Sequence, residues 1–242
     1  MSVNTDTLLQ AGGVGLGIGV LVWFAVTPLV ASIPYRLEKG WEQELAELAH
    51  AQADGKNLQL QPLSRRHQAI LCAAATVMGM LVVHMRGFSN TTAVLLAYLL
   101  GSLLLAAINW RTTMLPDRIV LPLLWAGLLF NAWSGRGAAP IYGATVGFCV
   151  PWLINWVLKR KSGGDAIGYG DMKTFGMAGA WFGLAAMPTV FVTFFACLIA
   201  QQLAIKLFGL RLSRHLPPGQ YLPTGVGHLA SSLAWIVGVQ LA

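Results

Sequence analysis

Long uninterrupted apolar runs constrain this chain more than any other feature. The run VLLAYLLGSLLLAAI at 94–108 contains no charged residue. A transmembrane helix needs about 20 mostly apolar residues, and a helix satisfies its own backbone hydrogen bonds within lipid. Hydrophobic residues make up 56% of the chain and charged residues 10%, whereas a soluble domain carries about 25% charged residues. The sequence therefore predicts an all-α polytopic membrane protein and argues against a soluble enzyme, a disordered chain or a coiled coil. It also argues against a membrane β-barrel, whose strands alternate in polarity over ~10 residues.

We expect about eight transmembrane helices in a single membrane domain that spans residues 1–242. They are predicted at 8–33, 69–85, 91–110, 118–134, 139–158, 171–185, 187–208 and 226–241. Pro188 is expected to separate the sixth helix from the seventh. The loop 34–68 holds an acidic amphipathic stretch and an Asp-Gly turn, and we expect it to form a short cytoplasmic hairpin.

Positive charge predicts the orientation of these helices. Alternate loops carry 14 of the 16 Lys and Arg residues, and the opposite side carries only Arg86 and Arg136. The positive-inside rule makes the richer side cytoplasmic and places both termini outside the cytoplasm. Topology thus accounts for the net charge of +7, so we expect no nucleic-acid partner, and anionic lipid headgroups are the expected neighbours.

Cysteine and histidine spacing gives no indication of a metal site. Cys72, Cys149 and Cys197 lie in apolar runs and form no C-x-x-C pair. His84 and His228 have no His or acid three or four residues away. We interpret both histidines as hydrogen-bonded side chains near the membrane interface.

Acidic residues are scarce, which makes them the first candidates for chemistry. Six of the nine precede residue 55 and are expected to lie on solvated faces. The other three lie near predicted membrane boundaries, where ionisable residues are usually functional. Among these, Asp165 is interpreted as a solvated loop acid, and Asp117 as the N-cap of the helix that follows it.

Asp171 has the richest surroundings, SGGDAIGYGDMKTFGMAGAWFG at 162–183. Gly168 and Gly170 remove side chains beside the acid, and glycine permits a positive φ and a close backbone approach. This pattern suits an acid that contacts a peptide. The alternative is structural, because Asp171 is also a good N-cap for the sixth helix.

These residues resemble a known family. Gly168-Tyr169-Gly170-Asp171, followed by Met172 and Lys173, resembles the G-x-G-D motif of the type IV prepilin peptidases, which are intramembrane aspartyl proteases. MLPDRIVLPLLWAGLLFN at 114–131 resembles a second segment of the family equally well. ASIPYRL at 31–37 and, more loosely, LPPGQYLPTG at 216–225 extend the resemblance over nearly the whole chain.

The resemblance implies a membrane-embedded endopeptidase in the inner membrane of a bacterium. Its substrate would be a type IV prepilin or pseudopilin, whose short basic leader is removed at the cytoplasmic face. The family uses two aspartates and a water molecule, so peptidase activity needs neither a cofactor nor a metal. Its second activity is N-methylation from S-adenosylmethionine, which stays open because no residue here can be tied to it.

This sequence departs from the family at the first aspartate. The family's acid lies eight residues before the Asp of the L-P-D segment, and counting back from Asp117 gives Asn109. An amide neither ionises nor lends an acidic proton, so the resemblance implies a chain that is inactive as written. Three explanations are open: an engineered Asp→Asn change, a natural paralogue that has lost the acid, or a register in which Asp117 is the partner of Asp171. The two C-x-x-C pairs that many family members carry in the first cytoplasmic loop are also missing from 34–68.

We therefore expect a prepilin peptidase whose catalytic pair is Asp171 and the position of Asn109, with Gly168, Gly170 and Lys173 shaping the loop and the substrate site. One rival is a paralogue that binds prepilins without cutting them. The other is a small transporter, which should place polar groups around a cavity near the middle of the membrane. A peptidase should instead gather its acids at one face.

Overall fold

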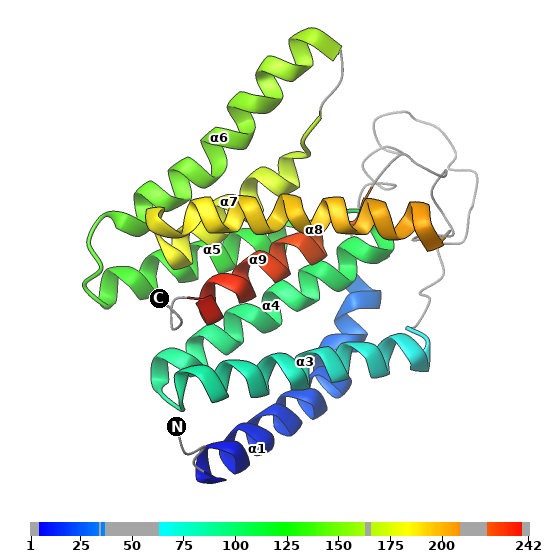
Figure 1. Cartoon of the computed structure of the whole chain (residues 1–242), viewed down its shortest axis with the longest axis vertical. Helices are drawn as coiled ribbons and strands as arrows, with labels where there is room; N and C mark the ends of the chain where they lie inside the picture. The colour runs from blue at the N-terminus through cyan, green and yellow to red at the C-terminus, as the bar shows by residue number, and fades with distance from the viewer. Residues whose placement is uncertain (1–4, 34, 37–62, 163–165, 209–221, 239–242) are drawn as a thin grey trace. The chain divides into compact units, whose positions relative to one another are not determined.

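The computed structural model describes residues 5–33, 35–36, 63–162, 166–208 and 222–238, and these are helical with short turns and no strand (Figure 1). Apart from its two ends, the predicted hairpin at 34–68 lies outside the described residues, and so does Asp165. The chain divides into two compact units, residues 1–84 and 85–242, which are described separately below. The single domain and the hairpin therefore stay expectations.

The first unit contains the N-terminal helix and most of the next one. Helix α1 (Thr5–Leu21) continues through one π-helical turn, η1 (Val22–Val26), and helical residues extend to Ile33; α3 spans Arg65–Arg86. Glycines allow α1 and α3 to approach closely. A Cβ on Gly15 would lie 2.8 Å from the carbonyl oxygen of Thr76, and a Cβ on Gly79 would lie 2.7 Å from Ile18. Small residues of this kind are typical of close contacts between membrane helices.

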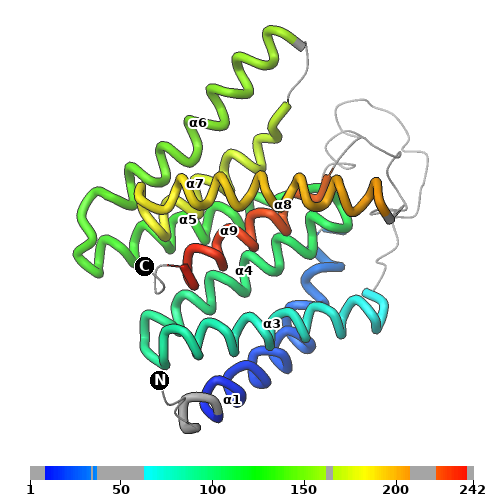
Figure 2. The backbone as a smooth tube through the Cα atoms, in the orientation of Figure 1, coloured from blue at the N-terminus to red at the C-terminus, as the bar shows by residue number. Residues whose placement is uncertain are grey.

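The second unit contains the remaining helices. They are α4 (Asn90–Thr112), α5 (Asp117–Trp133), α6 (Ala139–Ser162), α7 (Tyr169–Phe182), the 3₁₀ turn η2 (Leu184–Ala186), α8 (Met187–Phe208) and α9 (Gly225–Gly238). Helix α7 packs against both α5 and α6, and α9 packs against both α4 and α8. Figure 2 shows α6 extending beyond the helices that it contacts.

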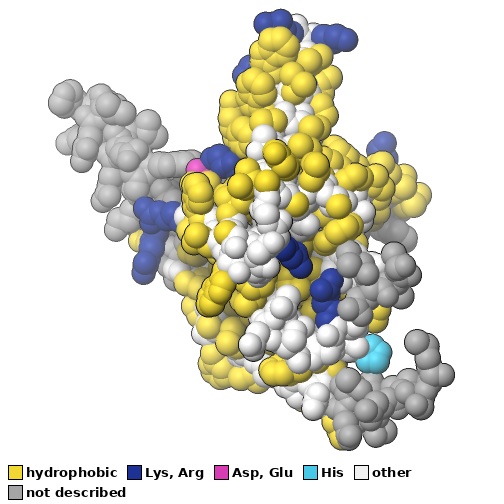
Figure 3. Space-filling view, turned by 90° about the vertical axis from the view of Figure 1, so that its left-hand side faces the viewer, with side chains coloured by type: hydrophobic (Ala, Val, Ile, Leu, Met, Phe, Trp, Pro, Cys, Tyr) yellow, Lys and Arg dark blue, Asp and Glu magenta, His cyan; other side chains and the backbone are white. Residues whose placement is uncertain are grey.

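In the part of the chain that the structure describes, five helical segments are long and apolar enough to cross a membrane. They are Leu9–Ile33, Arg65–Arg86, Asn90–Thr112, Ala139–Lys161 and Leu184–Leu207, and Gly225–Gly238 is a shorter apolar helix. Each of the eight predicted segments lies on a helix where it is described, except that Ser134 and Gly183 fall just beyond the ends of α5 and α7. Figure 3 shows hydrophobic side chains along α6, with Lys and Arg gathered at its tip, where Lys159, Arg160 and Lys161 form the last turn. The chain is a multi-pass α-helical membrane protein, as the composition predicted.

Helices α6 and α7 meet through their backbones. A Cβ on Gly143 of α6 would lie 2.5 Å from the carbonyl oxygen of Gly179 in α7, and a Cβ on Gly147 would lie 2.8 Å from the carbonyl carbon of Phe175. Only glycine fits at such contacts. They fix the position of α7, the helix that begins with the G-x-G-D motif.

The break between α7 and α8 is made by glycine rather than by proline. Gly183 ends α7 with a φ of +82°, a conformation that L-residues rarely adopt. Pro188 lies instead in the first turn of α8, where its missing N–H leaves no hydrogen bond unmade. The prediction that Pro188 separates the two helices was therefore wrong. The corner packs over a core that includes Phe175, Met187 and Phe194.

Candidate active site

Asp171 lies in the first turn of α7, and its side chain is 14% exposed. The N-cap of this helix is Gly168, and no side chain caps it. The structural alternative, in which Asp171 is the N-cap, is therefore wrong. The Asp171 carboxylate instead faces α9, where its Oδ1 lies 3.1 Å from Nε2 of His228.

His228 lies one turn into α9, and its side chain is buried. Its ring contacts the rings of Phe175 and Phe194, with centroids 4.6 and 4.5 Å away. A single proton between Nε2 and Oδ1 of Asp171 joins the two residues, and Nδ1 is buried without a hydrogen-bond partner among the described residues. The prediction that His228 is hydrogen-bonded is confirmed, but its partner is an acid from a different helix, which spacing along α9 could not reveal.

Asn109 lies in the last turn of α4 and is 1% exposed. Its Oδ1 accepts a 2.8 Å hydrogen bond from the backbone N–H of Gly225, the first residue of α9. Its Nδ2 donates to the carbonyl oxygen of Met114 at 3.4 Å. These two partners fix the orientation of the amide, because an N–H needs an acceptor and a carbonyl needs a donor.

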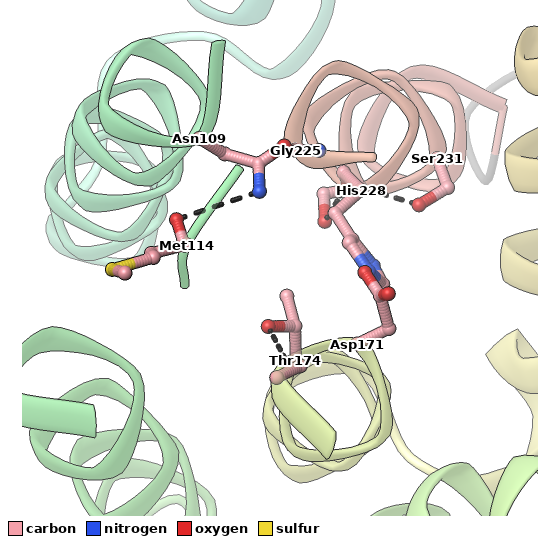
Figure 4. Close-up of polar contacts among 9 residues, drawn as sticks. Asn109, Met114, Asp171, Thr174, Gly225, His228 and Ser231 are labelled. Atoms are coloured by element: carbon pink, nitrogen blue, oxygen red, sulfur yellow. Dashed lines mark hydrogen bonds and ion pairs between the residues drawn. The ribbon is translucent and has the colours of Figure 1, made fainter. Parts of the chain in front are cut away.

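The first turn of α9 connects the two predicted positions (Figure 4). Asn109 reaches α9 at Gly225, and Asp171 reaches it at His228, three residues later. Residues three apart lie on neighbouring positions of one helical turn. Among the described contacts no hydrogen bond joins Asn109 to Asp171 directly, and each side chain is held by α9 instead.

Glycine at position 225 is required by this arrangement. A Cβ there would lie 2.8 Å from Cα of Ala106 and 2.9 Å from Cβ of Asn109. Both distances are too short for any side chain. The start of α9 can therefore approach the end of α4 closely enough for the Gly225 N–H to reach the amide of Asn109.

Asp117 is the first residue of α5 and forms an ion pair with Lys173 of α7. The Lys173 ammonium donates to Oδ2 at 2.6 Å and to Oδ1 at 2.8 Å. The N-cap of α5 is Pro116, without a side-chain cap bond, so the predicted capping role of Asp117 was wrong. Asp117 and Lys173 join the first turns of α5 and α7 instead.

The two glycines of the motif act through their lack of a side chain. Gly168 has φ −70° and Gly170 is helical, so neither uses the positive φ that the sequence suggested. A Cβ on Gly170 would lie 3.0 Å from Cβ of Leu115, and a Cβ on Gly168 would lie 3.3 Å from Oδ2 of Asp171. Gly170 therefore makes room for the segment between α4 and α5.

The residues that lead into the motif are held by α6. Oδ1 of Asn155, a buried side chain, accepts from the backbone N–H of Ala166 at 2.8 Å and of Ile167 at 3.0 Å. At the other side of the motif, Thr174 donates to the carbonyl oxygen of Gly170 at 2.8 Å. The short segment before Asp171 thus has a fixed conformation.

The chemistry available here is that of one carboxylate, one imidazole and one amide. Among the described residues no three His, Cys, Asp or Glu side chains come together as a metal site would need. Asp171 and His228 can hold and move a proton, whereas Asn109 can only donate and accept fixed hydrogen bonds.

Comparison with known proteins identifies the group to which these residues belong. Residues 94–205, which include Asn109, Asp117, Asp171 and Lys173, match the type IV leader peptidase family. A prepilin leader peptidase/N-methyltransferase of Escherichia coli K12 is 33% identical over 170 residues, which cover 69% of this chain and 74% of that protein. The chain belongs to this family.

Two further members show how much of the family's length the chain covers. The prepilin leader peptidase/N-methyltransferase of Burkholderia pseudomallei strain 1026b is 36% identical over 170 residues, 68% of this chain and 54% of that protein. One from Klebsiella pneumoniae is 47% identical over 88 residues, 36% of this chain and 39% of that protein. The chain thus spans about half the length of several curated relatives that it matches. No solved structure matches it.

His228 and Gly225 are the site residues that the sequence reasoning missed. Both lie beyond the matched range 94–205. The available signal was an imidazole inside an apolar helix, which marks a functional position in a membrane protein. Spacing along one helix could not reveal the partner of His228, because Asp171 lies 57 residues away on another helix.

Proposed function

We propose that this chain carries the prepilin leader peptidase site, with Asp171 as its one carboxylate and Asn109 in the place of the second. Its substrate would be a type IV prepilin or pseudopilin, whose hydrophobic helix lies in the bilayer and presents the leader junction at the cytoplasmic face. The observation that carries the proposal is that Asn109 and Asp171, from two different helices, both bind the first turn of α9.

Peptide cleavage by this site needs two carboxyl groups that exchange protons with a water molecule. One, ionised, accepts the proton of the attacking water, and the other, protonated, donates to the scissile carbonyl oxygen. Asp171 is suited to the first role because His228 already shares a proton with it. Asn109 cannot take the second role, because an amide has no acidic proton to give. We therefore propose that the chain as it stands binds the leader junction and cuts it poorly or not at all.

The hydrogen bonds of Asn109 suggest how an aspartate would sit in its place. An acceptor is needed toward Gly225 N–H and a donor toward the carbonyl oxygen of Met114. A protonated carboxyl group supplies both, whereas an ionised one would face the Met114 oxygen with a second acceptor. The two hydrogen-bond partners at position 109 thus favour a protonated carboxyl group there, which is the proton-donating member of the pair.

The family resemblance implies a location in the bacterial inner membrane, and the distribution of Lys and Arg supports an orientation with both termini on the periplasmic side. The site lies at the C-terminal end of α4 and the N-terminal ends of α5, α7 and α9. Asp117 and Asp171 are therefore at the same end of the unit. This arrangement argues against the transporter alternative, in which polar groups surround a midplane cavity.

The names of the relatives include an N-methyltransferase activity, which would bring S-adenosylmethionine. One cavity of the second unit is lined by two arginines and no carboxylate. Because arginines repel a sulfonium cation, this cavity does not fit that cofactor.

The deciding experiment restores the missing acid. Purified protein and its Asn109→Asp variant are incubated in detergent with a prepilin, and leader removal is followed by gel shift and mass spectrometry. We expect cleavage by Asn109→Asp at a rate 10²–10⁴-fold above the parent, the usual contribution of a positioned acid or base. Adding Asp171→Asn should abolish it again. Cleavage by the parent at the same rate as Asn109→Asp would overturn the proposed pair.

A binding measurement separates the peptidase from a paralogue that has lost catalysis but kept its ligand. The parent and the Asn109→Asp, Asp171→Asn double variant should both retain prepilin in a detergent pull-down. If neither protein retains prepilin, the proposed substrate is wrong, whether position 109 is Asn or Asp.

A further inference from the structure

The second unit contains a cavity at the end opposite Asn109 and Asp171. Its volume is about 200 Å³. The cavity is bounded by the start of α4 and by the ends of α5, α7 and α9. Its lining includes the charged and aromatic side chains of Arg86, Phe130, Arg136, Trp181, Phe182 and Trp235. Four of the six are aromatic, and the other two are arginines.

The two arginines bring positive charge to this cavity without a matching acid. Arg86 is held in place because its Nε donates to the carbonyl oxygen of Ile236 at 3.0 Å. The positive charge of Arg136 is close enough to repel that of Arg86. In the described part of the unit Asp117 is bonded to Lys173 and Asp171 to His228, and no carboxylate pairs with Arg86 or Arg136. Two like charges beside a shared cavity favour an anion between them, and the planar guanidinium group fits a phosphate with two parallel hydrogen bonds.

The sequence shows that this placement is selective. Of the 16 Lys and Arg residues, only Arg86 and Arg136 belong to the outward side of the predicted topology. Both of them line the same cavity. The outward side of the predicted topology thus places both of its basic residues at this one cavity.

The walls of the cavity indicate what carries the anion. Apart from the arginines and Thr91 they are apolar. They include Trp235, which is half-buried near the end of α9, and tryptophan near a helix end is typical of the membrane interface. Trp133, just before the turn that holds Arg136, is 93% exposed. Figure 3 looks onto this end, where dark-blue side chains lie among hydrophobic and uncharged ones. A soluble phosphate would gain nothing from such walls, whereas a lipid would bury part of its chain there.

We propose that this cavity binds one anionic phospholipid, with its phosphate between Arg86 and Arg136 and the upper part of an acyl chain against the aromatic walls. The lipid would belong to the leaflet opposite the peptidase site and would fill the space between the ends of α5, α7 and α9. This inference does not depend on the proposed peptidase function, because it uses none of the same residues.

Native mass spectrometry of the detergent-purified chain tests the site. Phosphatidylglycerol, phosphatidylcholine and inorganic phosphate are titrated separately, and the bound fraction is measured for the parent, Arg136→Gln, Arg136→Lys and Arg86→Gln. Arg118→Gln is the matched control, because Arg118 is an exposed arginine at the other end of α5. Arg136 is exposed in a turn, so its substitution should leave folding intact even if Arg86→Gln does not.

We expect the parent and Arg118→Gln to retain one phosphatidylglycerol in preference to phosphatidylcholine. Arg136→Gln should weaken this binding about fivefold, the usual contribution of one basic residue to anionic-lipid binding, and Arg136→Lys should retain most of it. Bound phosphatidylglycerol should also raise the unfolding temperature of the parent more than that of Arg136→Gln. Equal retention by Arg136→Gln and the parent would overturn the site. Equal binding of the two lipids would overturn the role of charge, and competition by inorganic phosphate at the same concentration as lipid would show a soluble anion as the ligand instead.

Discussion

His228 of α9 and Asp171 of α7 meet through a 3.1 Å contact between Nε2 and Oδ1, inside a cluster of phenylalanine rings. A carboxylate that is largely removed from water needs a hydrogen-bonding partner, because an unpaired buried charge costs several kcal/mol. The histidine therefore holds the Asp171 side chain in place through this hydrogen bond. This pairing ties the proposed catalytic carboxylate to the same helix whose first N–H binds Asn109.

Loss of the histidine should impair cleavage without removing an acid. In the Asn109→Asp background we expect His228→Ala to lower the rate at least tenfold, because a hydrogen bond to a charged group is worth roughly 1.5–3 kcal/mol. His228→Gln keeps an N–H that can reach Asp171 and should lose less. The measurement is the initial rate of leader removal, with unfolding temperature as the control. A rate for His228→Ala equal to that of its parent would show that Asp171 needs no partner.

The ion pair between Asp117 and Lys173 should matter little for catalysis. The Asp117 side chain is 50% exposed and that of Lys173 28% exposed, and exposed pairs contribute about 0–1 kcal/mol. In the Asn109→Asp background Asp117→Asn should lower the cleavage rate only a few-fold, with Lys173→Gln as the matched change on the other partner. If Asp117→Asn instead abolishes cleavage while position 109 tolerates either Asn or Asp, then Asp117 is the true partner of Asp171.

Replacement of Gly170 tests whether this glycine serves the substrate or the fold. Gly170→Val should impair cleavage in the Asn109→Asp background, because its Cβ would lie 3.0 Å from Cβ of Leu115. If that crowding is the cause, the second change Leu115→Ala should restore part of the rate. Failure of Leu115→Ala to restore any activity, with the protein folded, would support the sequence-based view that Gly170 admits the substrate backbone.

The glycine contact between α6 and α7 should govern stability. Gly179→Ala is expected to lower the unfolding temperature, because its Cβ would collide with the backbone of Gly143, and forced contacts of this kind cost about 1–3 kcal/mol or more. Gly12→Ala is the control, because nothing lies within 4 Å of a Cβ at that position. Equal unfolding temperatures for Gly179→Ala and Gly12→Ala would show that the close contact between α6 and α7 does not contribute to stability.

Cysteine labelling tests the predicted orientation. In a background without Cys72, Cys149 and Cys197, single cysteines placed at 50–60 or 160–165 should react with a membrane-impermeant reagent only when it reaches the cytoplasmic side. A cysteine at position 136 should show the opposite pattern. Labelling of the first two regions from outside would reverse the topology derived from the charges.

The helices were predictable from the sequence because apolar runs in a membrane leave few alternatives to a helix. Asp171 and position 109 were predicted from the resemblance of two extended segments to the family. Both lie at helix ends, Asn109 in the last turn of α4 and Asp171 in the first turn of α7. What the sequence could not give were contacts between helices far apart in the chain. Asp117 resembled a helix cap because its partner Lys173 is 56 residues away. The partner of His228 could not be predicted for the same reason, because Asp171 is 57 residues away.

The break after α7 was misassigned for a related cause. Proline is the obvious helix breaker in a sequence, yet in a first turn it fits without strain. The residue that turns the chain is Gly183, whose φ of +82° is visible only in the folded backbone.

The two hydrogen bonds of Asn109 bear on how such a protein evolves. An amide at this position joins the end of α4 to the start of α9 as well as a protonated acid would, so selection for a folded protein does not preserve the acid. One base change suffices to convert an aspartate codon to an asparagine codon. A lineage relieved of the need to cut prepilins can therefore lose the chemistry at once and keep its architecture. The contact between Gly143 and Gly179 is under the opposite pressure, because any side chain there disrupts the helix pair whether or not the enzyme works.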